Sequence, residues 1–373
     1  MVFLNTGERY IYIARLLKGD TKMFEEFMLV PDYPVLKYPM LLGISVTQKC
    51  NLRCGYCLAD GGESAVNELT DDELFNILSY AAEVGIQDID FSGGEPLTRP
   101  VFPEMLEFCY NKDLNVLLAT NGTLIDDKFA KLLKKAIDYI SLEIRISLDG
   151  DTRESHEKFR EKGSFELVCQ GITRLLEVGL IPNITMVVHR DNIAEIKNVL
   201  RFMEQKSLKK LHLMPFIPKG RGKAFKELAL DQKILRFLLE NKRIFSSQTG
   251  IIIEMESPLE CLIAPPDDLS KPRRCAAGYI FLGILPEGSF FPCPHMRECI
   301  IGNIRRNTIE EVWREAAVLQ DLRNPELLKG ACRNCQFKIV CNGGCHGAAY
   351  DIMGDYLMPD PFCWIANPDG GCF

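Results

Sequence analysis

The chain is 373 residues long, which is too long for one small core and predicts two domains plus an extension. Its residues are 47% hydrophobic and 25% charged, and the net charge of -7 argues against nucleic acid or an acidic membrane surface as a partner. No apolar run approaches the roughly 18 residues that span a bilayer, and no signal peptide opens the chain, so we expect a cytoplasmic protein without a membrane partner.

Residues 1–38 form a short extension in which two apolar stretches could pair as a hairpin. From residue 39 apolar strands alternate with amphipathic helices. Thr70 and Glu73 predict a capping box that begins one helix, and Gly85 is placed to end it. Six strands that alternate with helices predict parallel pairing, and an arc of six strands forms an open, partial barrel over residues 39–220. The expected strands are 41–47, 88–93, 115–122, 142–150, 184–189 and 211–216.

Polar residues and glycines gather at the carboxyl ends of four consecutive expected strands. In parallel barrels this edge carries the active site. Four strands with special residues at the same end therefore predict one shared site. The segments are Cys50, Ser92–Pro96, Thr120–Gly122 and Ser147–Gly150.

The composition changes towards the C-terminus. Residues 221–260 are expected to form a helical connector. From residue 261 cysteine, glycine and proline become more frequent, and residues 279–293 predict a hairpin that turns at Pro286–Ser289. Residues 261–373 are therefore expected to form a small α+β domain built around metal.

The chain has fifteen cysteines, a large number for a sequence without a secretion signal. In such a protein they are typical of metal ligands or catalysts rather than of disulfides. Ten lie from Cys261 onward, and Cys109 and Cys169 stand alone, as buried thiols of helices would. The remaining three are Cys50, Cys54 and Cys57.

This triplet has spacings of three and two residues. Three thiolates so close together can hold three irons of an iron–sulfur cube, which leaves the fourth iron without a protein ligand. A substrate or cofactor can bind at such an open metal position. Tyr56, just before the last cysteine, adds a flat apolar surface. A zinc or redox site is the alternative for the triplet alone.

With Gly93-Gly94-Glu95 after the next strand, the triplet resembles the radical S-adenosylmethionine (radical SAM) superfamily over roughly residues 41–215. The resemblance implies a partial (β/α)6 barrel in which the open iron chelates SAM. One electron then cleaves SAM to a 5′-deoxyadenosyl radical, which takes a hydrogen atom from the substrate.

The same resemblance implies contacts to SAM. Gly93 and Gly94 would let the backbone approach the amino group, Ser147 and Asp149 would lie near the ribose and methionine, and Arg160 would pair with the carboxylate. The complete expected set is Tyr56, Gly93, Gly94, Glu95, Asn121, Ser147, Asp149, Arg160 and Leu213.

Structural roles remain open for four of these residues. Arg160 could be a solvated charge at a helix end, and Asp149 a turn residue before a glycine. Asn121 could simply shape its loop, and Leu213 could be core packing.

The C-terminal cysteines resemble the seven-cysteine signature of the SPASM extension that a subset of radical SAM proteins carries. The resemblance implies two auxiliary [4Fe–4S] clusters, three clusters in all. Structural zinc is the alternative, since four-cysteine sites often bind zinc. Cys275, Cys293 and Cys345 would hold the inner cluster. The outer cluster would be held by Cys332, Cys335, Cys341 and Cys363.

The inner cluster needs a fourth ligand or has an open iron. Cys261 is the best candidate, since it lies just upstream of Cys275. Cys299 and Cys372 are less favoured.

Auxiliary clusters suggest that an electron leaves the substrate radical, so we expect a net oxidation by a radical SAM oxidoreductase or maturase. Related proteins mostly modify peptides, which makes peptide or protein maturation the first hypothesis. Oxidation or decarboxylation of a small molecule, such as an aminocyclitol, sugar or tetrapyrrole, is the second. A non-catalytic iron–sulfur carrier or sensor is a third, disfavoured because a carrier needs no SAM site.

Two departures from related proteins bear on the substrate. Pro294 stands where sulfatase-maturing enzymes carry a catalytic Asp, which disfavours that activity. Residues 1–38 are too few for a fused leader-peptide domain, so we expect a peptide substrate to need a separate leader-binding protein or to be recognised by the barrel itself. We expect a flavodoxin- or ferredoxin-type donor to supply the electron.

Overall fold

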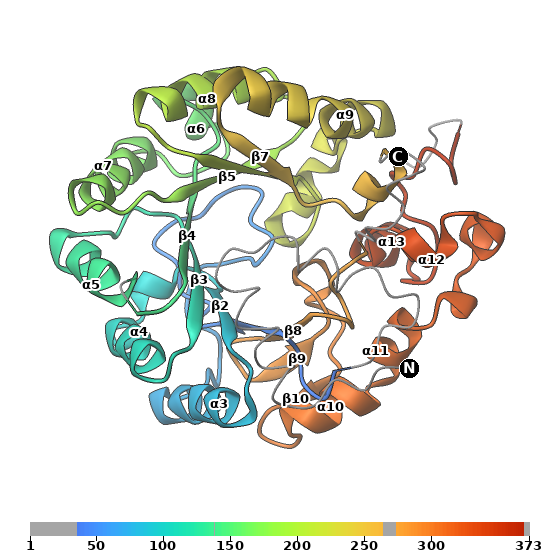
Figure 1. The fold of residues 1–373 in the computed structure, drawn as a ribbon, viewed down its shortest axis with the longest axis horizontal. Coiled ribbons are helices and arrows are strands. Elements are labelled where there is room, and N and C mark those ends of the chain that lie inside the picture. Colours follow the sequence, from blue (N-terminus) through green and yellow to red (C-terminus); the bar gives the residue numbers. More distant parts are fainter. Residues whose placement is uncertain (1–35, 138, 264–273, 369–373) are drawn as a thin grey trace.

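The computed structural model describes residues 36–137, 139–263 and 274–368 (Figure 1). The hairpin expected in residues 1–38 lies outside them. A single ten-stranded sheet has the order β10-β9-β8-β1-β2-β3-β4-β5-β6-β7. Its strands are β1 Leu41–Ser45, β2 Asp88–Ser92, β3 Asn115–Thr120, β4 Leu142–Ser147, β5 Asn183–Val188, β6 Lys210–Pro215, β7 Ile252–Met255, β8 Phe281–Ile284, β9 Ser289–Phe291 and β10 Gly302–Asn303.

Helices surround the arc of strands in Figure 1, and the helices of the C-terminal region lie together at its open side. In the barrel they are α3 Asp71–Val84, α4 Phe102–Asn111, α5 Asp127–Ile137, α6 Arg153–His156, α7 Ser164–Glu177, α8 Glu195–Gln205 and α9 Gln232–Thr249. In the C-terminal region they are α10 Ile309–Glu315, α11 Ala317–Leu322, α12 Lys338–Cys341 and α13 His346–Met353.

The expected α/β class and the parallel sheet are confirmed. Strands β1 to β6 pair in parallel in chain order. The sheet is longer than the six strands expected. Within residues 221–260, where only helices were expected, β7 pairs in parallel with β6. At the other edge β8 pairs in parallel with β1, so the C-terminal hairpin continues the barrel sheet.

The capping residues predicted from the sequence begin and end α3 where expected. The Thr70 hydroxyl accepts a hydrogen bond from the Glu73 N–H at 3.2 Å, and the Glu73 carboxylate accepts one from the Thr70 N–H at 2.8 Å. Gly85 ends α3 with a φ of 84°, a left-handed conformation that glycine adopts without strain.

Side chains alternate between the two faces of the strands. On β1 the Leu42 and Ile44 side chains are fully buried in the hydrophobic core that the helices cover. The intervening positions face the barrel interior, which is polar. There Arg145 of β4 forms ion pairs with Glu143 at 2.6 Å and with Glu256, which follows β7, at 3.1 Å. Because β4 and β7 are not neighbours in the sheet, this second pair spans the interior of the arc.

Two glycines without side chains allow the C-terminal hairpin to pack closely on the barrel sheet. An added Cβ on Gly43 of β1 would lie 2.4 Å from the Phe281 ring, and one on Gly283 of β8 would lie 2.1 Å from the Phe291 ring. Both aromatic rings therefore pack on bare backbone where β1, β8 and β9 meet. No helix among the described residues is long and apolar enough to cross a membrane.

Candidate active site at the carboxyl ends of the strands

The first three cysteines lie on the loop that follows β1, and all three are half-buried. Backbone contacts shape this loop. The Cys50 N–H donates to the Gly62 carbonyl at 2.8 Å, and Arg221 Nε donates to the Cys54 carbonyl at 2.9 Å. Burial raises the pKa of the Cys50 thiol to about 11. Thiolates are soft ligands that suit iron–sulfur clusters, so three half-buried thiols on one short loop fit such a cluster.

The Gly93-Gly94 pair packs against the backbone of the same loop. An added Cβ on Gly93 would lie 2.5 Å from the Thr47 carbonyl oxygen, and one on Gly94 would lie 2.2 Å from that of Lys49. Gly93 also has a φ of 129°. Both positions therefore require glycine in order to hold the cysteine loop against the end of β2.

Glu95 fixes the end of the neighbouring strand, β3, through hydrogen bonds. Its buried carboxylate accepts hydrogen bonds from the Thr120 hydroxyl at 2.8 Å and from the Asn121 N–H at 2.7 Å. Burial raises the pKa of Glu95 to about 7, although these hydrogen bonds act in the opposite direction. The Asn121 amide lies 3.9 Å from the Cys50 sulfur. Glu95 thus connects the end of β2 through Asn121 to the first cysteine.

Tyr56, Asp149 and Arg160 form one buried polar group. Arg160 Nε lies 2.5 Å from Asp149 Oδ2, and the Tyr56 hydroxyl donates to the same oxygen. The Arg160 guanidinium also lies 5.6 Å from the centre of the Tyr56 ring. Burial alone would raise the pKa of Asp149, but the Arg160 charge holds it below its ordinary value. Burial raises the pKa of Cys54, and Arg160 opposes that shift, so its charge reaches the cluster loop.

The last two expected SAM contacts lie on different faces of the sheet. Ser147 ends β4 and is half-buried at the active-site edge. Leu213 of β6 is 1% exposed and belongs to the hydrophobic core. The next residue, Met214, lines a cavity instead, as the alternation of side chains along a strand requires.

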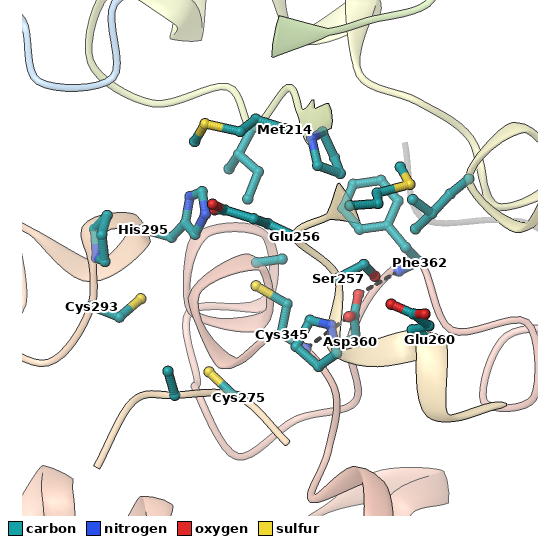
Figure 2. Close-up of a pocket in the computed structure, with 18 of the residues that line it drawn as sticks. Met214, Glu256, Ser257, Glu260, Cys275, Cys293, His295, Cys345, Asp360 and Phe362 are labelled. Atoms are coloured by element: carbon teal, nitrogen blue, oxygen red, sulfur yellow. Dashed lines mark hydrogen bonds between the residues drawn. The ribbon is translucent and has the colours of Figure 1, made fainter. Parts of the chain in front are cut away.

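The three expected inner-cluster ligands line this cavity, whose volume is about 330 Å³. Figure 2 shows Cys275, Cys293 and Cys345 on one side and the barrel residues Met214 and Glu256 on the other. Burial raises the pKa of all three thiols. The C-terminal cysteines therefore open towards the carboxyl ends of β6 and β7.

The four expected outer-cluster ligands line a second, smaller cavity of about 20 Å³. They come from separate segments, and three of the four are buried. These four cysteines therefore lie around one cavity, and their role as cluster ligands stays a prediction. This cavity is lined by Cys332, Cys335, Cys341 and Cys363.

Cys261 is the cysteine expected to complete the inner set. Its thiol is hydrogen-bonded to that of Cys341, an expected outer ligand, and it does not line the inner cavity. Its neighbour Glu260 does line the inner cavity. Its proposed role as the fourth inner ligand therefore stays a prediction.

Three residues of the site were not predicted from the sequence. Glu256 enters the cavity because the unexpected strand β7 places it there. Asp360 shapes the cysteine loop by accepting the Cys345 N–H at 2.8 Å. Arg297 donates to the Ser45 hydroxyl at 3.0 Å, a contact between residues far apart in the chain.

A parallel α/β arc with an open cysteine triad at its carboxyl edge is the architecture of an enzyme that binds its cofactor there. The family description "Radical SAM superfamily" matches residues 44–203, and "Iron-sulfur cluster-binding domain", the SPASM domain, matches residues 275–336. The chain belongs to the radical SAM superfamily and to its members that carry a SPASM domain. These are enzymes that bind SAM and a [4Fe–4S] cluster.

Three comparisons describe its relatives. The AdoMet-dependent heme synthase of Methanosarcina barkeri is 31% identical over 341 residues, 87% of this chain and 96% of that enzyme. The mycofactocin maturase MftC of Mycobacterium tuberculosis is 27% identical, covering 88% of this chain and 83% of that protein. The structure of Streptococcus suis SuiB with S-adenosylmethionine aligns with a TM-score of 0.73 at 18% identity, covering 97% and 84% of the two chains, which shows a shared fold.

Proposed function

We propose that this enzyme oxidises its substrate by a radical route that uses three [4Fe–4S] clusters. When bound, the first cluster and SAM supply a 5′-deoxyadenosyl radical that removes a hydrogen atom, and the auxiliary clusters accept the electron left on the substrate. One observation carries the proposal: the inner cysteine cavity opens onto the carboxyl ends of β6 and β7, the same edge that carries the first triad.

Arg297 also connects the inner cysteine set with the end of β1, from which the first cysteine loop leaves. Cys293 of the inner set is four residues from Arg297, whose guanidinium reaches the end of β1. Four residues span at most about 14 Å even when fully extended. A substrate held at this edge would therefore lie between the radical source and an electron acceptor.

The chain's own residues have positioning roles in this proposal. Arg160 and Tyr56 fix the Asp149 carboxylate at the edge where SAM would bind, and Glu95 fixes Asn121 beside Cys50. The aromatic rings of Phe159 and Phe216 pack around Tyr56 and exclude water from this side.

For the substrate we put a tetrapyrrole first. From the sequence we expected a peptide first, and we reverse that order because a heme synthase matches this chain at 31% identity over nearly its own full length. A peptide remains the second candidate, since a mycofactocin maturase matches at 27% identity over 88% of this chain. In either case a flavodoxin- or ferredoxin-type protein would deliver the first electron.

The reaction can be tested with protein reconstituted with iron and sulfide and reduced with dithionite. We expect it to convert SAM to methionine and 5′-deoxyadenosine. No 5′-deoxyadenosine from fully loaded protein would refute the proposed function.

The substrate class needs a separate comparison. Iron porphyrins bearing propionate groups should increase 5′-deoxyadenosine formation and lose hydrogen from their side chains. A stimulation by the precursor peptide of a neighbouring short reading frame, with no effect of the porphyrins, would favour the peptide instead.

A further inference from the structure

Arg297 is a residue of the C-terminal domain that reaches into the barrel. It follows the turn Pro294–Met296, four residues after Cys293. Its Nη1 donates a hydrogen bond to the Ser45 hydroxyl at 3.0 Å. Ser45 is the last residue of β1 and is 1% exposed. The guanidinium therefore stands at the strand end from which the first cysteine loop leaves.

The position of this guanidinium is fixed by packing. It lies 5.3 Å from the centre of the Phe291 ring, in a cation–π contact. Phe291 is itself buried on Gly283, where any larger residue would collide with the ring. One ring and one hydroxyl thus hold Arg297 in place before any ligand binds, and most of its N–H donors remain available.

Two other cations at this edge have carboxylate partners. Arg160 pairs with Asp149 at 2.5 Å, and Lys219 pairs with Asp351 at 2.7 Å. Within the described part of the chain, no carboxylate lies within ion-pair distance of Arg297.

Electrostatics agree with this geometry. Burial lowers the pKa of Arg297 to about 10, and the opposing effects of Cys57 and Glu287 are smaller. Arg297 is half-buried, and withdrawing a charge from water without a partner is costly, so such a site favours an anion.

We propose that Arg297 binds a carboxylate of the substrate and that the substrate is therefore a carboxylic acid. Guanidinium matches carboxylate in a two-point geometry, which orients the bound group as well as holding it. The contact would place the substrate between the first triad and the inner cysteine set. This inference rests on the proposed function and specifies the chemistry that its substrate carries.

The test measures affinity for two pairs of probes with the holoenzyme in the presence of SAM. The first pair is hemin and its dimethyl ester, and the second is a synthetic peptide containing glutamate and the same peptide with glutamine. We expect the acid of one pair to bind the wild type at least about tenfold more tightly than its neutral counterpart. The pair that responds identifies the source of the carboxylate.

Variants then assign the effect to Arg297. Arg297→Gln should remove the preference for the acid, and Arg297→Lys should restore part of it because a charge remains. Arg306→Gln is the matched control, since Arg306 is an exposed arginine of the same domain. Iron content checks that each variant is folded and loaded.

Three results would overturn the proposal. These are equal binding of acid and neutral probes in both pairs, an unchanged preference in Arg297→Gln, or a variant whose main defect is a higher SAM requirement for 5′-deoxyadenosine formation. The last result would place Arg297 in the SAM site instead. If the wild type fails to cleave SAM yet shows the Arg297-dependent preference, the proposed function fails and the carboxylate site stands.

Discussion

The barrel cysteines and the C-terminal cysteines are arranged in opposite ways. The barrel triad comes from one loop of eight residues, and its three thiols are half-buried. The seven C-terminal cysteines come from segments that are far apart in the chain, and five of them are buried. An accessible triad suits a cluster that must receive a ligand from solution. A buried set suits clusters that exchange only electrons.

Their charged neighbours differ as well. Arg160 opposes the rise in the pKa of Cys54, and so favours its thiolate. In the C-terminal region burial raises the pKa of Cys345 and Cys363, and the buried Asp360 adds to both shifts. Arg160 thus adds a cation beside the first site, where Asp149 acts in the opposite direction, and Asp360 adds an anion beside the second. More negative surroundings favour the oxidised form of a cluster, and a cationic setting favours the reduced form.

The largest effect is expected from removing a barrel ligand. Cys54→Ala leaves two thiolates, which cannot hold the cube, so 5′-deoxyadenosine formation should fall to background. Product analysis by chromatography measures it. Cys109→Ala is the matched control, because this residue of α4 is fully buried in the hydrophobic core and belongs to no expected cluster. Retained SAM cleavage in Cys54→Ala would show that the triad is not the radical source.

A C-terminal ligand should behave differently. Cys345→Ala should lower the iron content from about twelve to about eight per chain, while SAM cleavage stays measurable and substrate oxidation is lost. Iron and zinc analysis with product assays tests this, and Cys169→Ala, at a half-buried cysteine outside every expected ligand set, serves as control. About four irons together with zinc in the wild type would support a structural zinc domain instead.

A smaller effect is expected within the polar group beside the barrel triad. Arg160→Gln leaves Asp149 as a buried charge without its cation, which typically costs about 3–5 kcal/mol. We expect a lower denaturation midpoint and weaker SAM binding. The double variant Arg160→Gln with Asp149→Asn should regain part of the stability, since no unpaired charge remains. Additive losses in the double variant would show that the two residues act independently.

The sequence predicted the features that depend on local spacing. The cysteine triplet, the capping box of α3 and the polar strand ends are all set by residues a few positions apart, and they lie where expected.

Contacts between distant segments could not be predicted. Strand β7 pairs with β6, and strand β8 pairs with β1, so both extend the barrel sheet. The residues of β7 and β8 alone do not indicate which strands they pair with. The Arg297–Ser45 contact spans 252 positions. The hydrogen bond between the Cys261 and Cys341 thiols also depends on how two segments pack, and the role of Cys261 as the fourth inner ligand stays a prediction.

The smallest effect concerns the junction between the two regions. Arg305 of the C-terminal region pairs with Glu73 of α3, with Nε 2.6 Å from Oε1. The same carboxylate completes the capping box with Thr70. The pKa of Glu73 is lowered to about 2, first by the Arg305 hydrogen bond and then by the Thr70 backbone.

Two substitutions separate these roles. Glu73→Gln removes the charge and keeps a side chain that can cap, so it should cost about 0.5–1 kcal/mol, the usual value of a partly exposed ion pair. Glu73→Ala also removes the cap and should cost about 1 kcal/mol more. Urea denaturation at pH 7 measures both. Arg305→Gln should match Glu73→Gln if the ion pair joins the two regions, and a clearly smaller loss for Arg305→Gln would mean that Glu73 acts on α3 alone.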